Sequence, residues 1–474
     1  MAVGEGDPLL EAVADALGGT GPGGAYACGE YVLESLAGRS PGGIMLACAS
    51  VEDASMVLEG RTGWRRVPGS GGAVVLNPGS ARPVTLVGIE GPGVTSHLAG
   101  AAFTVLAMGI DLFEPSPRTL IDPLGGLSDL RAGVLRVPVE EALFDDPSRC
   151  FLAAGLRARF GLEPDADTMG ALRRASGLVG RVPPRRAWRV LSRLYSGTGL
   201  SEVSGFLRLT GALGALLPEV EAIYDVPQNY FHHLDVWGHT METLDRLEEM
   251  MEEPASRFRA HSGDITRHLA ETVEGGVDRR AFLAFAGLIH DLGKPKTRTV
   301  EPTGRIRFRG HQSVGAGLAG SVASRLGLGR RGTGHLRGIV GDHMRIGHLI
   351  KEGETTAARL KAAMEMGSHC VEVVLLSLAD RLATRGEAST EEAVERYSRV
   401  ASRVLADWFW LRRCPPLVDG RDVMVHAGVA PGPGVARALF EARVAQRECT
   451  VASRGEALEF LAPDFKGRMD GRGR

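Results

Sequence analysis

The stretch LIHDLGKPKT, residues 288–297, places His290 and Asp291 side by side in an apolar segment. The residues before it, RRAFLAFAGL, repeat apolar side chains at helical spacing and predict a buried helix. Gly293 predicts the end of this helix, and Pro295 makes its continuation costly. Because a buried ionisable group needs a partner, the pair is either a satisfied core histidine beside a capping aspartate or part of a larger ligand set.

The overall composition is that of an ordinary globular protein. The chain has 474 residues, enough for about three domains, with 44% hydrophobic and 24% charged residues. A net charge of −2 creates no general attraction to nucleic acid or to an anionic membrane. Six dispersed cysteines, no signal peptide and no long apolar run indicate a cytoplasmic protein without a membrane span.

The hydrophobic pattern changes along the chain. Short strand-like runs, namely AYAC (25–28), IMLACA (44–49), AVVL (73–76) and VTLVGI (84–89), alternate with helical patterns up to about residue 130. Helical runs dominate from about residue 131 onward. We therefore expect an α+β protein, with a small α/β head followed by a mostly α-helical body.

Further histidines and aspartates complete a possible ligand set around the His290–Asp291 pair. In chain order the set is His239, His290, Asp291, His311, His343 and Asp380. Imidazole and carboxylate groups on separate buried helices suit one or two divalent ions such as Mn, Fe, Co, Ni or Mg. The alternative is that these six residues are polar groups that satisfy one another in the core.

The order and flanks of this set resemble the HD superfamily of metal-dependent phosphohydrolases. The resemblance implies an HD-type helical domain in which His239, His290, Asp291 and Asp380 hold one metal, while His311 and His343 complete a second site. It also implies catalytic roles for two residues. Asp291 would bridge the ions, and Lys294 would meet a phosphate oxygen.

Longer blocks resemble bacterial tRNA nucleotidyltransferases and poly(A) polymerases. These blocks include TLIDPLGGLSDLRAGVLRV, DDPSRCFLAAGLRARFGL and PQNYFHHLDVWGHTMETL, and the similarity runs from about residue 24 to 462. It implies a nucleotidyltransferase-like head and an RNA substrate, possibly tRNA. The expected divisions are a head (1–130), a helical neck (131–225), an HD domain (226–400) and a helical tail (401–474).

The head departs from that family where carboxylates are expected. The Asp-x-Asp positions hold Gly43 and Met45, and Ala101 and Ala102 replace a charged pair. A hydrogen atom or a thioether is no ligand for magnesium, which needs hard oxygen atoms. We therefore expect a degenerate head that does not polymerise.

Arginines in the neck are candidate RNA contacts. Residues 173–193 contain seven arginines and no acid, and Trp188 lies among them. Guanidinium groups suit phosphate oxygens, and Trp188 either stacks on a base or belongs to the core. The tentative RNA-binding residues are Arg149, Arg185, Arg186 and Arg189.

These observations favour a metal-dependent phosphohydrolase acting on nucleotides or RNA ends, built on an inactive polymerase scaffold. One alternative is addition of CCA or poly(A) to RNA 3′ ends, which the family resemblance supports. A second alternative is a non-catalytic RNA-binding protein with a structural metal. The sequence does not give the oligomeric state.

Overall fold

The structure is a computed structural model that describes residues 3–4, 6–18, 24–69, 72–78, 82–115, 117–228, 234–385 and 390–462. The chain forms two compact units, each described separately below. Unit 1 comprises Met1–Val182 and Gly205–Leu216, and unit 2 comprises Pro183–Ser204 and Leu217–Arg474. The expected division into four parts stays a prediction.

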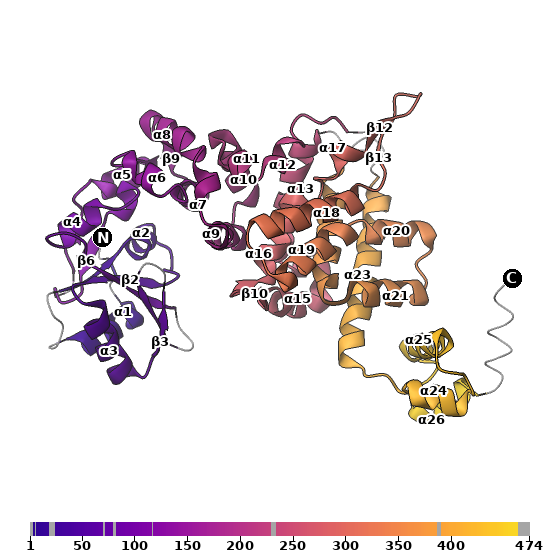
Figure 1. The fold of residues 1–474 in the computed structure, drawn as a ribbon. Coiled ribbons are helices and arrows are strands. Elements are labelled where there is room, and N and C mark those ends of the chain that lie inside the picture. Colours follow the sequence, from indigo (N-terminus) through magenta and orange to yellow (C-terminus); the bar gives the residue numbers. More distant parts are fainter. Residues whose placement is uncertain are drawn as a thin grey trace. The chain divides into compact units, whose positions relative to one another are not determined.

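Unit 1 begins with a mixed sheet of seven strands in the order β3-β4-β5-β2-β1-β6-β7. Figure 1 labels β2, β3 and β6 of this sheet. Among its neighbouring strands, β2 and β5 are parallel and the other pairs are antiparallel. The strands are β1 (Ala25–Cys28), β2 (Ile44–Cys48), β3 (Arg65–Pro68), β4 (Val74–Asn77), β5 (Val84–Gly88), β6 (Gly109–Asp111) and β7 (Leu120–Ile121).

Short helices accompany this sheet and then replace it along the chain. α3 packs on β4 and β5 and contacts α1, while α2 packs near β1 and β2. The helices are α1 (Pro8–Leu17), α2 (Glu30–Leu36), α3 (Val51–Thr62), α4 (Val94–Ala99), η1 (Thr104–Leu106), α5 (Gly126–Ala132), α6 (Glu141–Asp145), α7 (Arg149–Phe160), α8 (Ala166–Ser176), η2 (Val179–Arg181) and α11 (Ala212–Leu216). A two-stranded sheet joins β8 (Val134–Leu135) to β9 (Glu163–Pro164), and α10 (Leu200–Thr210) belongs to both units.

Unit 2 is almost entirely helical. α13 packs against α16 and α22, and α16 also contacts α9 and α19. Its first helices are α9 (Pro184–Ser196), α12 (Pro218–Glu221), α13 (Val236–Glu252), α14 (Ala255–Phe258), η3 (Arg259–His261), α15 (Ser262–Leu269), α16 (Arg279–Ile289) and α17 (Lys294–Thr297). The rest are α18 (His311–Arg325), α19 (Arg330–Asp342), α20 (Arg345–Glu352), α21 (Thr356–Met366), η4 (Gly367–His369), α22 (Cys370–Ala383), α23 (Glu391–Arg413), α24 (Gly420–His426), α25 (Pro433–Arg447) and α26 (Arg454–Phe460).

Two small hairpins and a C-terminal helix group complete unit 2. The hairpins pair β10 (Thr272–Glu274) with β11 (Val277–Asp278), and β12 (Arg298–Val300) with β13 (Ile306–Phe308). α24, α25 and α26 share their own apolar core, which includes Val423, Ala438 and Leu461. The α+β fold class predicted from the sequence is confirmed.

The segment Thr356–Ala383 is long and apolar enough to cross a membrane by composition, but 72% of its most apolar window is buried inside the protein. It covers α21, η4 and α22, which pack against α23 and against one another. Burial among other helices accounts for its apolar character, as in the core helix of a globular protein.

Gly293 has a different role from the one expected. α16 ends at Ile289 and α17 begins at Lys294, so Gly293 lies between two helices with an ordinary φ of −77°. A Cβ atom at Gly293 would collide with the His311 carbonyl and the Gly315 amide of α18. The glycine is therefore required by the close approach of α18 to this segment.

Candidate metal centre

The structure brings together all six residues of the expected ligand set. His239 lies in the first turn of α13, where the Asp235 side chain caps the helix by accepting from the Gly238 amide at 2.8 Å. The other five come from four further segments: His290 and Asp291 follow α16, His311 begins α18, His343 follows α19, and Asp380 lies near the end of α22. Only the folded chain makes them neighbours.

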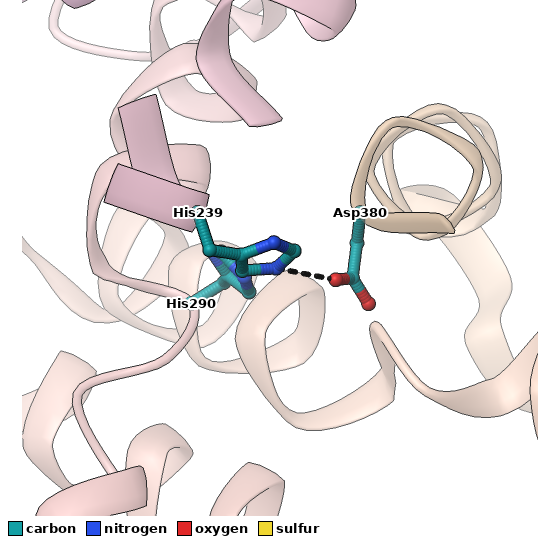
Figure 2. Close-up of side chains that lie close together, drawn as sticks. All are labelled: His239, His290 and Asp380. Atoms are coloured by element: carbon teal, nitrogen blue, oxygen red, sulfur yellow. Dashed lines mark hydrogen bonds and ion pairs between the residues drawn. The ribbon is translucent and has the colours of Figure 1, made fainter. Parts of the chain in front are cut away.

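One group consists of His239, His290 and Asp380 (Figure 2). His239 Nε2 lies 2.8 Å from Asp380 Oδ1. The two imidazole rings have centroids 5.9 Å apart, and both are buried. One nitrogen or oxygen atom from each residue lies within 4.8 Å of the others, which is compatible with a single bound ion.

A second group consists of Asp291, His311 and His343. His311 Nε2 lies 3.4 Å from Asp291 Oδ1 and 3.1 Å from His343 Nε2. Asp291 also connects the two groups, because its Oδ2 lies 3.1 Å from His290 Nε2 and 3.9 Å from His239 Nε2. This central carboxylate is 2% exposed.

Three of the histidines are held in the same tautomer. The Nδ1 atoms of His290, His311 and His343 lie 2.7 to 2.9 Å from the carbonyl oxygens of Gly287, Phe308 and Val340. A carbonyl oxygen can only accept, so each Nδ1 donates, and in the neutral ring each Nε2 carries a lone pair.

These lone pairs face one another inside the centre. Two bare Nε2 atoms of His311 and His343 at 3.1 Å repel each other unless a cation or a proton lies between them. His290 Nε2 is buried without a well-oriented hydrogen bond to any described residue. Metal-binding histidines usually donate their other ring N–H to a carboxylate, a backbone carbonyl or water, and the carbonyls here provide that contact.

Burial and charge set the protonation of this centre. Burial lowers the pKa of His343 to about 3, and it also lowers the pKa of His311. Burial alone would lower the pKa of His290, but the adjacent Asp291 raises it above its usual value. Burial acts to raise the pKa of Asp291, yet His290 and Lys294 hold it well below the usual range. An anionic carboxylate thus lies beside neutral His311 and His343, as a divalent ion requires.

Lys294 lies at the wall of a cavity of about 400 Å³ that opens onto the centre. Its Nζ lies 2.7 Å from Asp291 Oδ2, donates to Gln228 Oε1 at 2.6 Å, and sits 5.6 Å from the Phe308 ring centroid. Gln228 and Phe308 were not anticipated from the sequence, since neither residue type marks a metal site.

The residues fit a divalent transition metal. Each group offers imidazole nitrogen together with carboxylate oxygen. Mn, Fe, Co, Ni and Zn prefer such mixed sites to sites made of oxygen atoms alone. The lone-pair repulsion between His311 and His343 is relieved when an ion is present.

The neck arginines are placed differently from one another. Arg185, Arg186 and Arg189 are exposed on α9. Arg149 is half-buried and donates to the Ala142 carbonyl at 3.0 Å. Trp188 is 8% exposed, and its ring packs edge-on against two phenylalanines of α16, so of the two interpretations of Trp188 the core role is the correct one.

The head face that the family resemblance assigns to magnesium lacks carboxylates at the expected positions. Met45 of β2 is 38% exposed, and Thr85 pairs with it on β5. Asp111 is the one carboxylate within the seven described strands of this sheet. Magnesium therefore does not fit the side chains of Gly43 and Met45, and we derive no step through an ion held by them.

Comparison with known proteins finds a family match for the segment with the six clustered residues and relatives that are similar over most of the chain. Residues 236–385 match the HD domain family. The A-adding tRNA nucleotidyltransferase of Deinococcus radiodurans is 32% identical over 74% of this chain and 76% of its own length. The CC-adding tRNA nucleotidyltransferase of Thermus thermophilus is 30% identical over 70% of each chain.

Solved structures agree at the level of the fold. A CCA-adding enzyme in its apo form has a TM-score of 0.61 at 15% identity, covering 95% of this chain and 92% of the other. A Thermotoga maritima CCA-adding enzyme complexed with tRNA has a TM-score of 0.57 at 15% identity, covering 96% and 93%.

These relatives correct the function predicted from the sequence. The prediction of a phosphohydrolase on an inactive polymerase scaffold is wrong, because proteins similar over about three quarters of the chain are named for adding nucleotides to tRNA. The expectation of an inactive head rested on residues such as Gly43, Met45, Ala101 and Ala102 at fixed positions, whereas a metal ion needs only oxygen atoms within reach, whichever segment supplies them. The chain belongs to the tRNA nucleotidyltransferase family.

Proposed function

We propose that this protein acts on the 3′ end of tRNA and adds one or more nucleotides to it. The observation that carries the proposal is the similarity to A-adding and CC-adding enzymes over most of both chains. The neck supports it with three exposed arginines on α9, which suit phosphate oxygens of an RNA backbone.

Nucleotide addition needs oxygen ligands for catalytic ions, and the sheet of the head does not supply them at the expected positions. Gly43 and Met45 offer no carboxylate, and a Cβ at position 43 would approach the Pro83 carbonyl at 2.9 Å. Simple replacement of Gly43 by aspartate would therefore strain β2 against its neighbour. Oxygen ligands for catalytic ions must come from other residues, and Asp111 of β6 is the candidate within the strands.

The test is incorporation of labelled ATP or CTP into tRNAs that lack all or part of the 3′-terminal CCA sequence. Met45→Arg places a cation on the half-exposed face, where it repels metal ions, and Met45→Gln is the neutral control. We expect incorporation by the wild type and by Met45→Gln but not by Met45→Arg. Equal incorporation by all three would show that the catalytic ions do not bind near Met45.

RNA contact by the neck is tested separately. Changing Arg185, Arg186 and Arg189 together to Gln removes three exposed charges from α9 and leaves buried Trp188 in place. We expect weaker tRNA binding with a smaller dependence on salt concentration. Unchanged tRNA affinity would remove α9 from the RNA-binding surface.

We further propose that the six clustered residues hold two divalent ions, one for each group of three. Bound there, such an ion would act as a Lewis acid on a phosphate oxygen. Asp291 would lie between the ions, and Lys294 would balance negative charge at the open side of the centre. Metal content of the purified protein, measured before and after chelation, tests this assignment.

A further inference from the structure

A second cavity lies beside the metal centre, under the β12–β13 hairpin. Its volume is about 340 Å³, and its lining includes Arg305, Arg307, Arg309, His348 and Lys351. These arginines alternate with apolar residues in the sequence RIRFRG, and Ile306 and Phe308 line the same cavity.

The two cavities share part of their walls. Phe308, His311, Met344 and Lys351 line both the cavity over the metal centre and the cavity under the hairpin. His311 is also a member of the second ligand group. A ligand with one phosphate at the metal centre would therefore have its next few atoms directed toward the cationic cavity.

The charge of the second cavity is strongly positive. Its lining has three arginines and one lysine but no aspartate or glutamate. Glu301 offsets part of this charge, because it forms an ion pair with Arg307 and lies 3.9 Å from Arg309. The Arg309 side chain is nevertheless 78% exposed, and Lys351 forms no ion pair with the residues that the structure describes. A solvent-facing group of this kind suits a phosphate anion.

Phe308 gives the shared wall an aromatic surface. The ring is partly exposed, and Lys294 Nζ lies 5.6 Å from its centroid. Aromatic rings beside cations form the usual binding surface for single-stranded nucleic acid, in which a base stacks while the cations contact the backbone. An inorganic polyphosphate would use the cations but would gain nothing from the ring.

We propose that the cavity under the hairpin binds the phosphodiester adjacent to the group at the metal centre, so that the HD domain receives the end of a single-stranded RNA. Phe308 stacks on a base, and Arg305, Arg309 and Lys351 contact the backbone. The position of the RNA end rests on the proposed metal centre. The cationic cavity itself depends neither on a bound ion nor on nucleotide addition by the head.

Binding of a fluorescein-labelled RNA tetramer, tetra-adenylate with a 3′ phosphate, tests the proposal on the full-length protein. Binding is measured with EDTA and again with Mn²⁺. The variant combines Arg305→Gln, Arg309→Gln and Lys351→Gln. The control combines Arg257→Gln, Arg259→Gln and Arg267→Gln, which removes the same charge from exposed positions on α14, η3 and α15. Melting temperatures of both variants confirm folding.

We expect the hairpin variant to bind about tenfold more weakly in both conditions and with a smaller salt dependence, since each lost phosphate contact reduces the number of counterions released. The control variant should bind as the wild type does. Equal weakening of both variants, or no weakening of the hairpin variant, would overturn the proposal. Loss of nucleotide incorporation by the head would leave this outcome unaffected.

Phe308→Leu separates RNA from simple anions. We expect it to weaken binding of the tetramer and to leave competition by tripolyphosphate unchanged, because only the RNA has bases that stack. If the tetramer binds Phe308→Leu as well as the wild type, or if tripolyphosphate competes as effectively as unlabelled tetramer, the cavity is an anion site without preference for RNA.

Discussion

Metal loading of the HD domain should stabilise it by an amount that depends on the number of ions. An ion present at a hundred times its dissociation constant stabilises the native state by about 2.7 kcal/mol, so two independent ions contribute about 5 kcal/mol. At roughly 2–4 °C per kcal/mol for a domain of this size, the melting temperature should rise by about 10–20 °C. Differential scanning fluorimetry of chelated protein titrated with Mn²⁺ or Ni²⁺ measures this rise.

Ligand variants distinguish two ions from one. His239→Ala removes a member of the first group only, and His343→Ala removes a member of the second group only. Each variant should retain one ion by elemental analysis and about half of the thermal shift. Because neutral imidazole is the ligand, the shift should grow as pH rises and His290, whose pKa is raised, loses its proton. No thermal shift and no bound metal in the wild type would contradict the assignment of two ions to this centre.

Two substitutions test packing and buried charge in unit 2. Gly293→Ala should destabilise the protein by about 1–3 kcal/mol in urea unfolding, since the new methyl group meets backbone atoms of α18. Gly317→Ala on α18 meets open space and should be neutral or stabilising. Equal free energies of unfolding for the two variants would contradict the contact. Glu372→Gln should cost about 3–5 kcal/mol because Glu372, fully buried, lies 2.7 Å from a guanidinium and near two histidines, while exposed Glu395→Gln should cost little. These partners hold the pKa of Glu372 below its usual value. The difference in free energy of unfolding between the wild type and Glu372→Gln is therefore full above about pH 4.5 and shrinks as the pH falls below it. A difference that does not depend on pH would contradict the ion pairs.

Local patterns predicted the elements of the fold well. Residues 25–28 form β1 as expected, and the apolar runs near residues 44, 73 and 84 became β2, β4 and β5. The strands β3, β6 and β7 were not predicted. β3 contains two arginines and a proline, and β6 and β7 have only three and two residues, too few for an alternation to be recognised. Order along the sheet depends on long-range pairing and could not be read from the sequence.

The residues that the structure brings together could be recognised in the sequence where their types are expensive to bury. His290, Asp291 and Asp380 stood out because ionisable groups in apolar helices require partners. Two features had no signal in the sequence because they depend on how the backbone folds. One is the donation by three histidine Nδ1 atoms to backbone carbonyls, and the other is the contact of Lys294 with Gln228. The predicted function was wrong because the residues missing from the head were weighed more heavily than the similarity of the whole chain.

Nucleotide addition to tRNA tests the central proposal most directly. Purified wild-type protein would be mixed with a tRNA lacking its 3′-terminal residues and with labelled ATP or CTP, beside Met45→Arg prepared in parallel. We expect the wild type to produce labelled tRNA, with an activity that co-elutes with the protein and is absent from Met45→Arg. No labelling by the wild type with any of the shortened tRNAs would contradict the proposal.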